Sequence, residues 1–486
     1  MHRTPSVDWD WRNVCTPSDA LDEPEVYNVP TSAKGPEYFE GAPHDGNVSL
    51  LMVLVGLPAR GKTFLAQKLC RLLGWQGVHA MVFNVQVRWR QRLQTVVSPG
   101  HSPESPRFAS SSQFRDLYRP GSQAHTLYVK VLQEFAEEAK EFYAKGGQVV
   151  FLNDDFVTSA LRRDALMNIA PFARKTVFLE VQRDAHYNDG FEKLKIQDEY
   201  GRRVGISDAK EDFDDRIAAL QELYESLEPQ SGLSYIKLRD CSVMEVHELS
   251  GYLCGRLVAY LMNMSKVKVN HPIYFVRHGQ SVYNLDDRLG GNPELTEKGR
   301  QDAEVIYQFI AKLKEEDDAR AKSDGEGEMQ IWTSQLLRAR QTAEPAATRL
   351  GIKTLQWSSL NEIHAGVCED MTYDEVARVY PLIAKFRGDH KYTFRYPQGE
   401  SYQDLVLRIE PLIMALENAN RTVIVIAHQA VLRALLAYFG STSAENSVYW
   451  EVPHRTIWKA QYNSKGVASI VSLKLGDAVK GDGSKD

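Results

Sequence analysis

The sequence predicts an α/β protein with two successive domains, each built on a parallel sheet that helices cover. Its 486 residues are 43% hydrophobic and 25% charged, which is typical of globular chains and suits two or three domains. Short apolar runs alternate with amphipathic helical segments, a pattern that favours parallel sheets with helices on both faces. These runs form two series, separated by a polar stretch near residues 265–272.

The first series follows an irregular N-terminal tail, residues 1–47, which is rich in Pro, Asp, Glu and Ser. Residues 50–55 show a buried-strand pattern, and a Gly-rich turn and an amphipathic helix over 64–73 come next. Further strands are expected at 149–152, 176–181 and 235–238. An apolar helix ends near Asn263, so the first domain is predicted to span residues 48–264.

The second series predicts strands at 273–276, 331–333, 422–427 and 468–473. The second domain is therefore expected to span residues 265–475, followed by a polar tail over 476–486. Two polar or charged stretches, 98–113 and 314–328, are expected to form exposed loops.

Charge and cysteine content exclude several protein classes. With 58 Lys and Arg against 64 Asp and Glu, the net charge of −6 disfavours a broad basic face for nucleic acid or anionic membrane. The five cysteines lack Cys-x-x-Cys spacing, which fits a reduced compartment without disulfides or zinc. No apolar run is long enough to span a bilayer, and the N-terminus lacks a signal-peptide core. We therefore expect a cytoplasmic protein with no nucleic-acid or membrane partner.

A phosphate-binding loop follows the first predicted strand. Gly56-Leu57-Pro58-Ala59-Arg60-Gly61-Lys62-Thr63 fits Gly-x-x-x-x-Gly-Lys-Thr and opens a predicted helix. Its backbone N–H groups and the helix N-terminus would surround an anion, while Lys62 reaches the outer phosphates and Thr63 holds Mg²⁺. Asp154 and Asp155 follow the strand at 149–152 and place a carboxylate at the same edge of the sheet. The pattern predicts a site for ATP and Mg²⁺.

Two strand ends in the second series each deliver a histidine. The candidate set is His278 and His428, Arg277, Arg338 and Arg433, and Glu362. A neutral imidazole can attack phosphorus, and guanidinium groups can neutralise the phosphoryl oxygens. A carboxylic acid can protonate the leaving oxygen. The set therefore predicts metal-independent phosphoryl transfer through a phosphohistidine.

Longer motifs connect both halves to one known family. In the first half they are residues 56–63, 82–85 and 259–263. In the second half they are residues 277–281, 289–292, 332–336, 360–363, 365–369, 395–397, 399–403 and 428–431. Over residues 48–475 the chain resembles the bifunctional 6-phosphofructo-2-kinase/fructose-2,6-bisphosphatase family. The resemblance implies a P-loop kinase-type domain followed by a histidine-phosphatase domain of the phosphoglycerate-mutase-like kind.

The resemblance also implies roles for individual residues. His278 would form the phosphohistidine from the 2-phosphate of fructose-2,6-bisphosphate, a regulator of glycolysis and gluconeogenesis, and Glu362 would be the general acid. The residues implied to hold the transferring phosphoryl group are Arg277, Asn284, Arg338 and His428. Those implied to bind the rest of the substrate are Gly291, Tyr373, Arg387, Lys391, Tyr402, Gln429 and Arg433. The products would be fructose-6-phosphate and phosphate, with no cofactor.

The phosphatase half departs mildly from the family pattern. Gln280 replaces a frequent Glu, and His364 stands where the family usually has Asp. Because His364 lies two residues from Glu362, it could shift the pH optimum.

The kinase half departs more seriously. Arg90 keeps its place in 86–90, Asp154 survives, and Lys195 matches a family lysine, but Tyr128 replaces an Arg. Polar or cationic residues also become Phe156, Val157 and Ala160. Because cations supply most of the affinity for a phosphorylated acceptor, we expect a kinase half that binds ATP, with Mg²⁺ at Thr63 and Asp154, but is weak or inactive.

Three other interpretations stay open. The chain is a true two-way enzyme if its acceptor contacts are rebuilt from Arg88, Arg90, Arg92, Arg119 or Lys130. Alternatively, the kinase half is a nucleotide-sensing or dimerisation module that joins two copies in a homodimer. The phosphohistidine chemistry could also serve another sugar phosphate or phosphoglycerate, although the implied 6-phosphate contacts favour a bisphosphorylated sugar.

Overall fold

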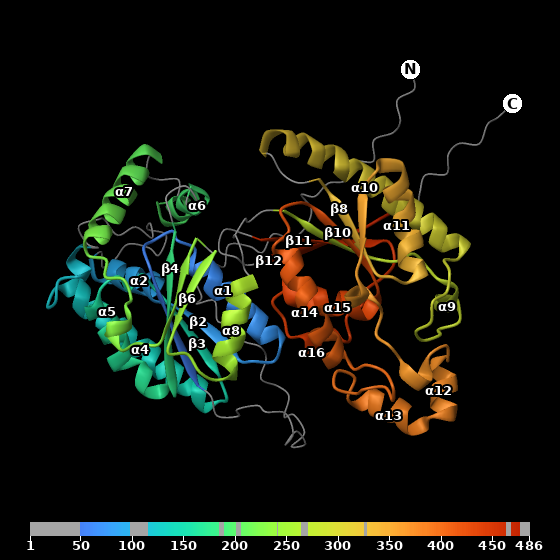
Figure 1. Ribbon diagram of the computed structural model, residues 1–486, viewed down its shortest axis with the longest axis horizontal. Coiled ribbons are helices and arrows are strands. Elements are labelled where there is room, and N and C mark those ends of the chain that lie inside the picture. Colours follow the sequence, from blue (N-terminus) through green and yellow to red (C-terminus); the bar gives the residue numbers. More distant parts are fainter. Residues whose placement is uncertain are drawn as a thin grey trace.

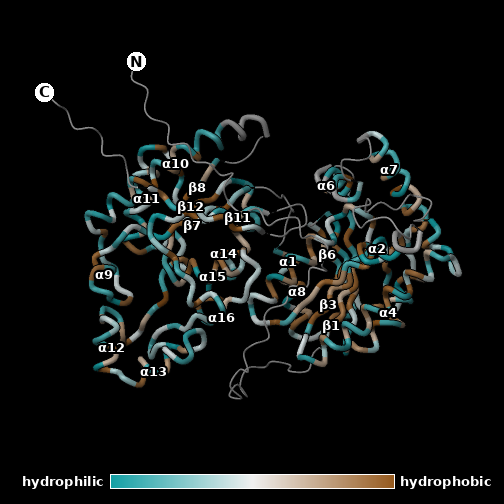
Figure 2. The backbone as a smooth tube through the Cα atoms, turned by 180° about the vertical axis from the view of Figure 1, so that it is seen from behind, coloured by the Kyte–Doolittle hydropathy of each residue, from teal (hydrophilic) through white to brown (hydrophobic). Residues whose placement is uncertain are grey.

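The fold is taken from a computed structural model that describes residues 49–97, 115–183, 189–200, 206–240, 242–263, 271–324, 328–462 and 468–476. Two six-stranded sheets stand side by side, each between layers of helices (Figure 1). The central strands of the first sheet are strongly hydrophobic and lie inside the molecule (Figure 2). The α/β class predicted from the sequence is confirmed.

The first sheet has the order β2-β3-β1-β4-β5-β6. Its strands are β1 (Leu50–Val55), β2 (Ala80–Asn84), β3 (Val149–Asn153), β4 (Lys175–Gln182), β5 (Tyr235–Arg239) and β6 (Val243–His247). Alternate residues of β1 enter two different cores, so both faces of the strand are buried. Helices α1 (Lys62–Trp75) and α8 (Tyr252–Asn263) cover one face, and α2 (Val85–Val97), α4 (Gln123–Ala144) and α5 (Ser159–Asn168) cover the other.

Two further helices, α6 (Asp189–Tyr200) and α7 (Ile206–Glu222), contact each other and lie beyond the end of this sheet (Figure 1). They bring Glu199 and Arg216 toward the loop between β1 and α1, as described below.

The second sheet has the order β12-β11-β7-β10-β8-β9. Its strands are β7 (Ile273–Arg277), β8 (Gln330–Thr333), β9 (Lys353–Gln356), β10 (Val423–Ala427), β11 (Thr456–Tyr462) and β12 (Ala468–Lys474). Helices α10 (Glu297–Asp324) and α11 (Leu337–Leu350) pack on one face, and α14 (Tyr402–Glu417) and α15 (Gln429–Phe439) on the other. The shorter helices are α9 (Val282–Leu285), α12 (Tyr373–Val379), α13 (Pro381–Asp389) and α16 (Ala444–Ser447).

Neither sheet is wholly parallel, which corrects the sequence expectation. β6 pairs antiparallel with β5, and β11 pairs antiparallel with both β7 and β12. These strands lie at or near sheet edges and carry mixed polar and apolar residues, so they lack the continuous apolar runs that mark buried parallel strands.

The loop expected at 314–328 is also wrong, because α10 continues to Asp324. The stretch contains neither Gly nor Pro before Gly325, and its Lys, Glu and Ala residues are good helix formers. Lys314 and Asp318 form an i,i+4 ion pair at 2.9 Å, which supports the added turns. The other expected loop, 98–113, and the tails at 1–47 and 477–486 lie outside the described residues.

The two halves meet where α1 contacts α14 and α15. The indole Nε1 of Trp75 donates to the carbonyl oxygen of Ala434 at 3.1 Å. Glu417 of α14 is buried between Lys68 and Arg71 of α1, at 3.2 and 3.0 Å. One hydrophobic core therefore runs from α1 into the second half. Among the described residues, none of the helices has the length and hydropathy needed to cross a membrane.

Candidate active sites

The two predicted histidines leave neighbouring parallel strands at the same level. Arg277, the last residue of β7, pairs in register with Ala427, the last residue of β10. His278 and His428 therefore emerge together at the carboxyl edge of the sheet, where open α/β folds place ligands. Their ring centroids are 5.0 Å apart.

The imidazole of His278 is held as a neutral nucleophile. Its Nδ1 donates to the carbonyl oxygen of Gly279 at 2.7 Å, so the lone pair lies on Nε2. The guanidinium Nε of Arg338 lies 3.3 Å from that Nε2. Burial, together with the positive charges of Arg338 and Arg277, holds the pKa of His278 well below its usual range.

His428 lies fully buried beside the nucleophile, at the N-cap of α15. Its Nε2 is 2.7 Å from the hydroxyl of Ser334, while Nδ1 has no hydrogen-bond partner among the described residues. Burial and then Arg338 and His278 hold its pKa well below the usual value. The ring therefore stays neutral at the site.

Backbone carbonyls fix the two arginines nearest the nucleophile. Arg277 donates to the carbonyl oxygen of Val452 at 2.9 Å, and Arg338 to that of Gly291 at 2.9 Å. Burial lowers the pKa of Arg277 to about 10, which leaves it charged at neutral pH. Gly291 has φ +60°, and a Cβ there would lie 2.4 Å from the ring of Tyr283. Gly291 thus orients Arg338, and its neighbour Gly290 lines the cavity instead.

Glu362 is placed by the first turn of α15. One carboxylate oxygen accepts from the N–H of Ile363 at 3.0 Å, and both lie within 3.3 Å of the N–H of Ala430. These contacts fix the carboxyl group at the N-terminus of α15, the helix that has His428 as its N-cap.

One cavity of about 200 Å³ collects most of the predicted phosphatase residues. They are Arg277, His278, Asn284, Arg338, Glu362, Tyr373, Arg387, Lys391, Tyr402, Gln429 and Arg433. The charge of its lining is strongly positive, since the only carboxylates among the lining residues are Glu362 and Asp287. The cavity suits a small ligand with several negative charges.

A second group of cations, Arg387, Lys391 and Arg433, lines the same cavity. Arg387 of α13 bonds the hydroxyls of Tyr396 and Tyr373, and Arg433 donates to the hydroxyl of Tyr402 at 3.0 Å. Burial, with Arg433 and Arg387 nearby, lowers the pKa of Lys391 to about 8. Cations at two places in one cavity allow it to hold two phosphoryl groups.

Two departures from the family pattern stay outside this cavity. His364 is exposed, and its Nδ1 accepts from the N–H of Gly366 at 3.1 Å. Gln280 bonds Thr296 at 3.2 Å. Neither lines the cavity, so an effect of His364 on the pH optimum stays a prediction.

The sequence reasoning missed several lining residues, among them Arg288 and Tyr396. Tyr396 lies inside the motif at 395–397 and could have been singled out there. Arg288 carries no such signal, because it is drawn in by the carbonyl oxygen of Asp370, which is distant in sequence.

The glycine loop of the first half has the geometry of a phosphate cradle. Gly56 has φ +142°, and a Cβ there would lie 2.4 Å from the carbonyl oxygen of Val181. Gly61 has φ +87° and is the N-cap of α1, so only residues without a Cβ suit the turn. Lys62 and Thr63 then begin the helix, as a site for ATP and Mg²⁺ requires.

Lys62 points into its own loop. Its Nζ donates to the carbonyl oxygens of Gly56 and Leu57 at 2.8 and 2.7 Å, and to Asp155 at 2.8 Å. Although burial acts to raise the pKa of Asp155, Lys62 and Lys195 hold it below its usual value. Asp155 is therefore the carboxylate in contact with the loop lysine.

Asp154 faces a phenol where the family resemblance implied a cation. The hydroxyl of Tyr128 donates to Asp154 at 2.6 Å. Burial and the neighbouring Asp155 raise the pKa of Asp154. Its carboxylate lies next to that of Asp155, at the end of the strand that also provides Asn153 to Thr63.

Three cations surround one buried carboxylate beside the loop. Glu199 lies 2.8 Å from Arg90, 3.0 Å from Lys195 and 2.7 Å from Arg216. Arg90 also bonds Gln86, which donates to Asp155. The cluster lies close to Asp155, because Lys195 and Arg216 act with Lys62, against the effect of burial, to lower the pKa of that carboxyl group. Arg216 was not predicted, although a single Arg on the apolar side of α7 was a usable signal.

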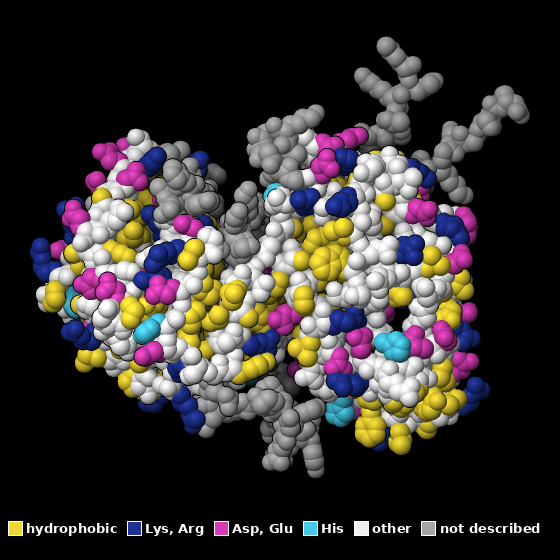
Figure 3. Space-filling view, in the orientation of Figure 1, with side chains coloured by type: hydrophobic (Ala, Val, Ile, Leu, Met, Phe, Trp, Pro, Cys, Tyr) yellow, Lys and Arg dark blue, Asp and Glu magenta, His cyan; other side chains and the backbone are white. Residues whose placement is uncertain are grey.

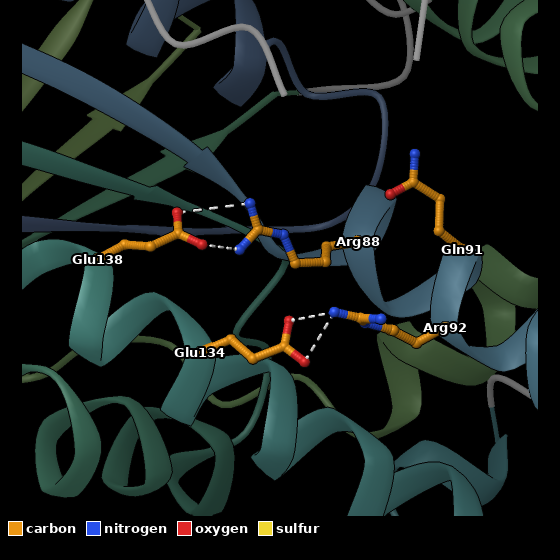
Figure 4. A pocket seen from close by; sticks show the side chains of 5 residues that line it. All are labelled: Arg88, Gln91, Arg92, Glu134 and Glu138. Carbon is orange, nitrogen blue, oxygen red and sulfur yellow. Dashed lines mark hydrogen bonds and ion pairs between the residues drawn. The ribbon is translucent and has the colours of Figure 1, made fainter. Parts of the chain in front are cut away.

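Of the cations considered for a rebuilt acceptor site, Arg90 is the one in this cluster. Arg88 and Arg92 instead bridge α2 to α4 through Glu138 and Glu134 (Figure 4). Arg119 forms an exposed pair with Asp116 at 3.6 Å, and Lys130 is exposed on α4. Arg88 and Arg92 therefore act on helix packing.

Comparisons with known proteins agree with this division of sites. A 6-phosphofructo-2-kinase family model matches residues 40–268, and the histidine phosphatase superfamily (branch 1) matches 273–474. The 6-phosphofructo-2-kinase/fructose-2,6-bisphosphatase 4 of Macaca fascicularis is 36% identical over 85% of this chain and 82% of its own. The 6-phosphofructo-2-kinase/fructose-2,6-bisphosphatase of Gallus gallus is 35% identical over 86% and 83%.

Proposed function

The chain belongs to the 6-phosphofructo-2-kinase/fructose-2,6-bisphosphatase family, and on this premise we propose that it is a two-way enzyme. Its second half would hydrolyse fructose-2,6-bisphosphate to fructose-6-phosphate and phosphate. Its first half would make fructose-2,6-bisphosphate from fructose-6-phosphate and ATP. The family relationship supports this reading better than the weak or inactive kinase half expected from the sequence.

One observation carries the phosphatase proposal: His278 presents an unprotonated Nε2 next to Arg338, in a cavity that also contains Glu362. Nε2 would attack the phosphorus of the 2-phosphate, and the bond from phosphorus to the sugar O2 would break. Glu362 would give its proton to O2, so that fructose-6-phosphate leaves. The product on the enzyme would be a phosphohistidine.

The second step would return the enzyme to its starting state. Glu362, now a carboxylate, would take a proton from water as the water oxygen attacks phosphorus. The bond to Nε2 would break, and phosphate would leave with His278 neutral again. Arg277 and Arg338 would neutralise the phosphoryl oxygens in both steps, because their guanidinium groups are already fixed by Val452 and Gly291.

The second cationic group supports a bisphosphorylated sugar over a monophosphate. Arg387, Lys391 and Arg433 would bind the 6-phosphate while the 2-phosphate lies at His278. The reading with another sugar phosphate or phosphoglycerate leaves this group without a role.

The phosphatase proposal predicts phosphate release from fructose-2,6-bisphosphate without added metal. Substituting His278→Ala should abolish the release and the acid-labile, base-stable labelling of the enzyme by substrate phosphate. The control is His390→Ala, a histidine at the end of α13 that does not line the cavity. Unchanged release in His278→Ala would overturn the phosphohistidine mechanism.

For the kinase direction, ATP would supply the phosphoryl group, and Mg²⁺ would neutralise its charge at Thr63 and Asp154. Lys62 would leave Asp155 and turn toward the phosphates. Arg90, Lys195 and Arg216 would attract the 6-phosphate of the acceptor, since all three lie within 3.0 Å of Glu199 and so form one cationic group beside the loop. This cluster supports an acceptor site that keeps more cations than the motif comparison indicated.

A second candidate function is a phosphatase with a weak kinase half. The ion pair between Lys62 and Asp155 favours it, because nucleotide must compete with that pair. The bond between Tyr128 and Asp154 favours it as well. A nucleotide-sensing role stays a prediction, and it would use α1, which begins at the loop and contacts α15.

We further propose the domain division at 48–264 and 265–475, a cytoplasmic location and a homodimer through the kinase-like half. Neither nucleic acid nor membrane is a proposed partner. On the face shown in Figure 3, side chains of both charges are interspersed, and neither sign forms a broad patch, which supports that view.

A further inference from the structure

Residues 452–455, just before β11, are connected to the segment around His278 by three sets of contacts. Arg277 donates to the carbonyl oxygen of Val452 at 2.9 Å. His454 donates from Nδ1 to the carbonyl oxygen of His278 at 2.7 Å. Arg455 pairs with the buried Asp302, which in turn accepts from the N–H of Gln280 at 3.1 Å. Residues 277 and 278 thus bond directly to residues 452–455, and Gln280 is connected to Arg455 through Asp302.

Of the three contacts, that of His454 is made to His278 itself. Its ring centroid lies 5.7 Å from that of His278, with the planes at 61°. Burial and the charge of Arg277 lower its pKa to about 4, so it stays neutral. A neutral ring that donates from Nδ1 keeps that bond without adding a charge beside the phosphoryl site.

The backbone around His454 is strained, and the strain is localised. Arg455 has φ +53°, a conformation that side chains with a Cβ rarely adopt. The pair with Asp302 and the bond from the N–H of Leu475 to the carbonyl oxygen of Arg455, at 2.7 Å, hold it there. Such strain persists where the surroundings determine the geometry, and it is common beside functional sites.

We infer that His454 is a positioning residue for the nucleophile: its Nδ1–H fixes the peptide plane between His278 and Gly279. The next residue, Gly279, has its carbonyl oxygen at the position where it accepts from Nδ1 of His278. This bond keeps the lone pair on Nε2. His454 does not line the cavity and touches no substrate. The inference rests on the proposed phosphohistidine reaction.

The test compares two substitutions of nearly equal shape. His454→Asn keeps an N–H donor for the carbonyl oxygen of His278, whereas His454→Leu has none. The measurement is the single-turnover rate of phosphohistidine formation from labelled fructose-2,6-bisphosphate, with KM determined in parallel. His79→Leu, at a half-buried histidine just before β2 in the other half, is the matched control.

We expect His454→Leu to slow phosphohistidine formation by roughly ten-fold to a hundred-fold, since small misplacements of a reacting group have effects of that size. KM should change less than about two-fold, because the cations that bind substrate are untouched. His454→Asn should recover most of the rate. A direct readout is ¹⁵N NMR of His278, which should report protonation at Nδ1 in the wild type and His454→Asn, and a mixture of tautomers in His454→Leu.

Equal rates in His454→Leu and wild type would overturn the inference, as would equal losses in the Leu and Asn variants. If His454→Leu fails to fold, the NMR tautomer in His454→Asn decides: a wild-type tautomer supports the inference and a mixture overturns it. These results are separate from the proposed reaction, because a wild-type protein that forms no phosphohistidine contradicts the reaction itself.

Discussion

Lys391 links the charge of the substrate cavity to pH. Its folded-state pKa is lowered to about 8 by burial and by Arg433 and Arg387, so it is protonated below that pH and neutral above it. Since the protonated form is the one that would attract the 6-phosphate, kcat/KM for fructose-2,6-bisphosphate should fall as the pH rises through about 8. The measurement is a pH profile of kcat/KM between 6 and 10.

The control for this decline of kcat/KM is Lys391→Arg. An arginine stays charged throughout that range. In this variant, the decline of kcat/KM at alkaline pH should therefore shift to higher pH or disappear. Affinity for the substrate should also fall somewhat, because the arginine side chain has a different shape. An identical decline in the variant would show that a group other than Lys391 causes it.

For single residues, the sequence predicted the site well where a catalytic residue directly follows a strand. His278 and His428 were predictable because each comes after an apolar run, and parallel register then places them together. His454 was not predictable, since its partner lies 176 residues away and reaches it through an antiparallel strand. Arg216 was missed because its helix carries no motif, and its one signal was its place on the apolar side of α7.

The two halves of the molecule are joined through the contact between α1 and α14. Glu417 is almost fully buried, with Lys68 and Arg71 against it, and its carboxylate also accepts from Tyr438 at 2.7 Å. Removing one partner of a buried ionic group leaves uncompensated charge, which costs about 3–5 kcal/mol. Glu417→Ala should therefore lower the thermal unfolding midpoint markedly.

Glu410 provides the comparison on the same helix. It pairs with Arg256 at 3.3 Å, but both side chains are partly exposed. Partly exposed pairs contribute about 1 kcal/mol or less, so Glu410→Ala should have a small effect on the same midpoint. Similar shifts for the two variants would contradict the view that the α1–α14 contact is a buried ionic joint.

Some helices and edge strands were not predicted correctly from the sequence. The strands of both sheet centres were expected to within about two residues, because they are continuous apolar runs buried on both faces. A loop was expected at 314–328 because the stretch is densely charged, although its Lys, Glu and Ala residues favour the helix that continues to Asp324. β6 and β11 carry mixed polarity, so neither was expected.

At the scale of the whole molecule, β6 is the candidate contact for a second copy. Among the described strands it pairs with β5 alone, and it exposes Val243 at 58% and Val246 at 45%. An exposed apolar edge strand is a surface on which another chain can pair. The wild-type mass in solution should be twice that of the 55.1 kDa chain, and Val246→Lys should reduce it toward one copy. A monomeric wild type, or a variant that stays dimeric, would contradict pairing through β6.

The central claim is that both halves are active, and one preparation assayed in both directions tests it most directly. We expect ATP- and Mg²⁺-dependent formation of fructose-2,6-bisphosphate from fructose-6-phosphate, and metal-independent phosphate release from fructose-2,6-bisphosphate. Lys62→Met should abolish the first activity and keep the second, whereas Lys210→Met, an exposed lysine of α7, should keep both. If no fructose-2,6-bisphosphate forms at saturating fructose-6-phosphate while phosphate release persists, the two-way account is wrong.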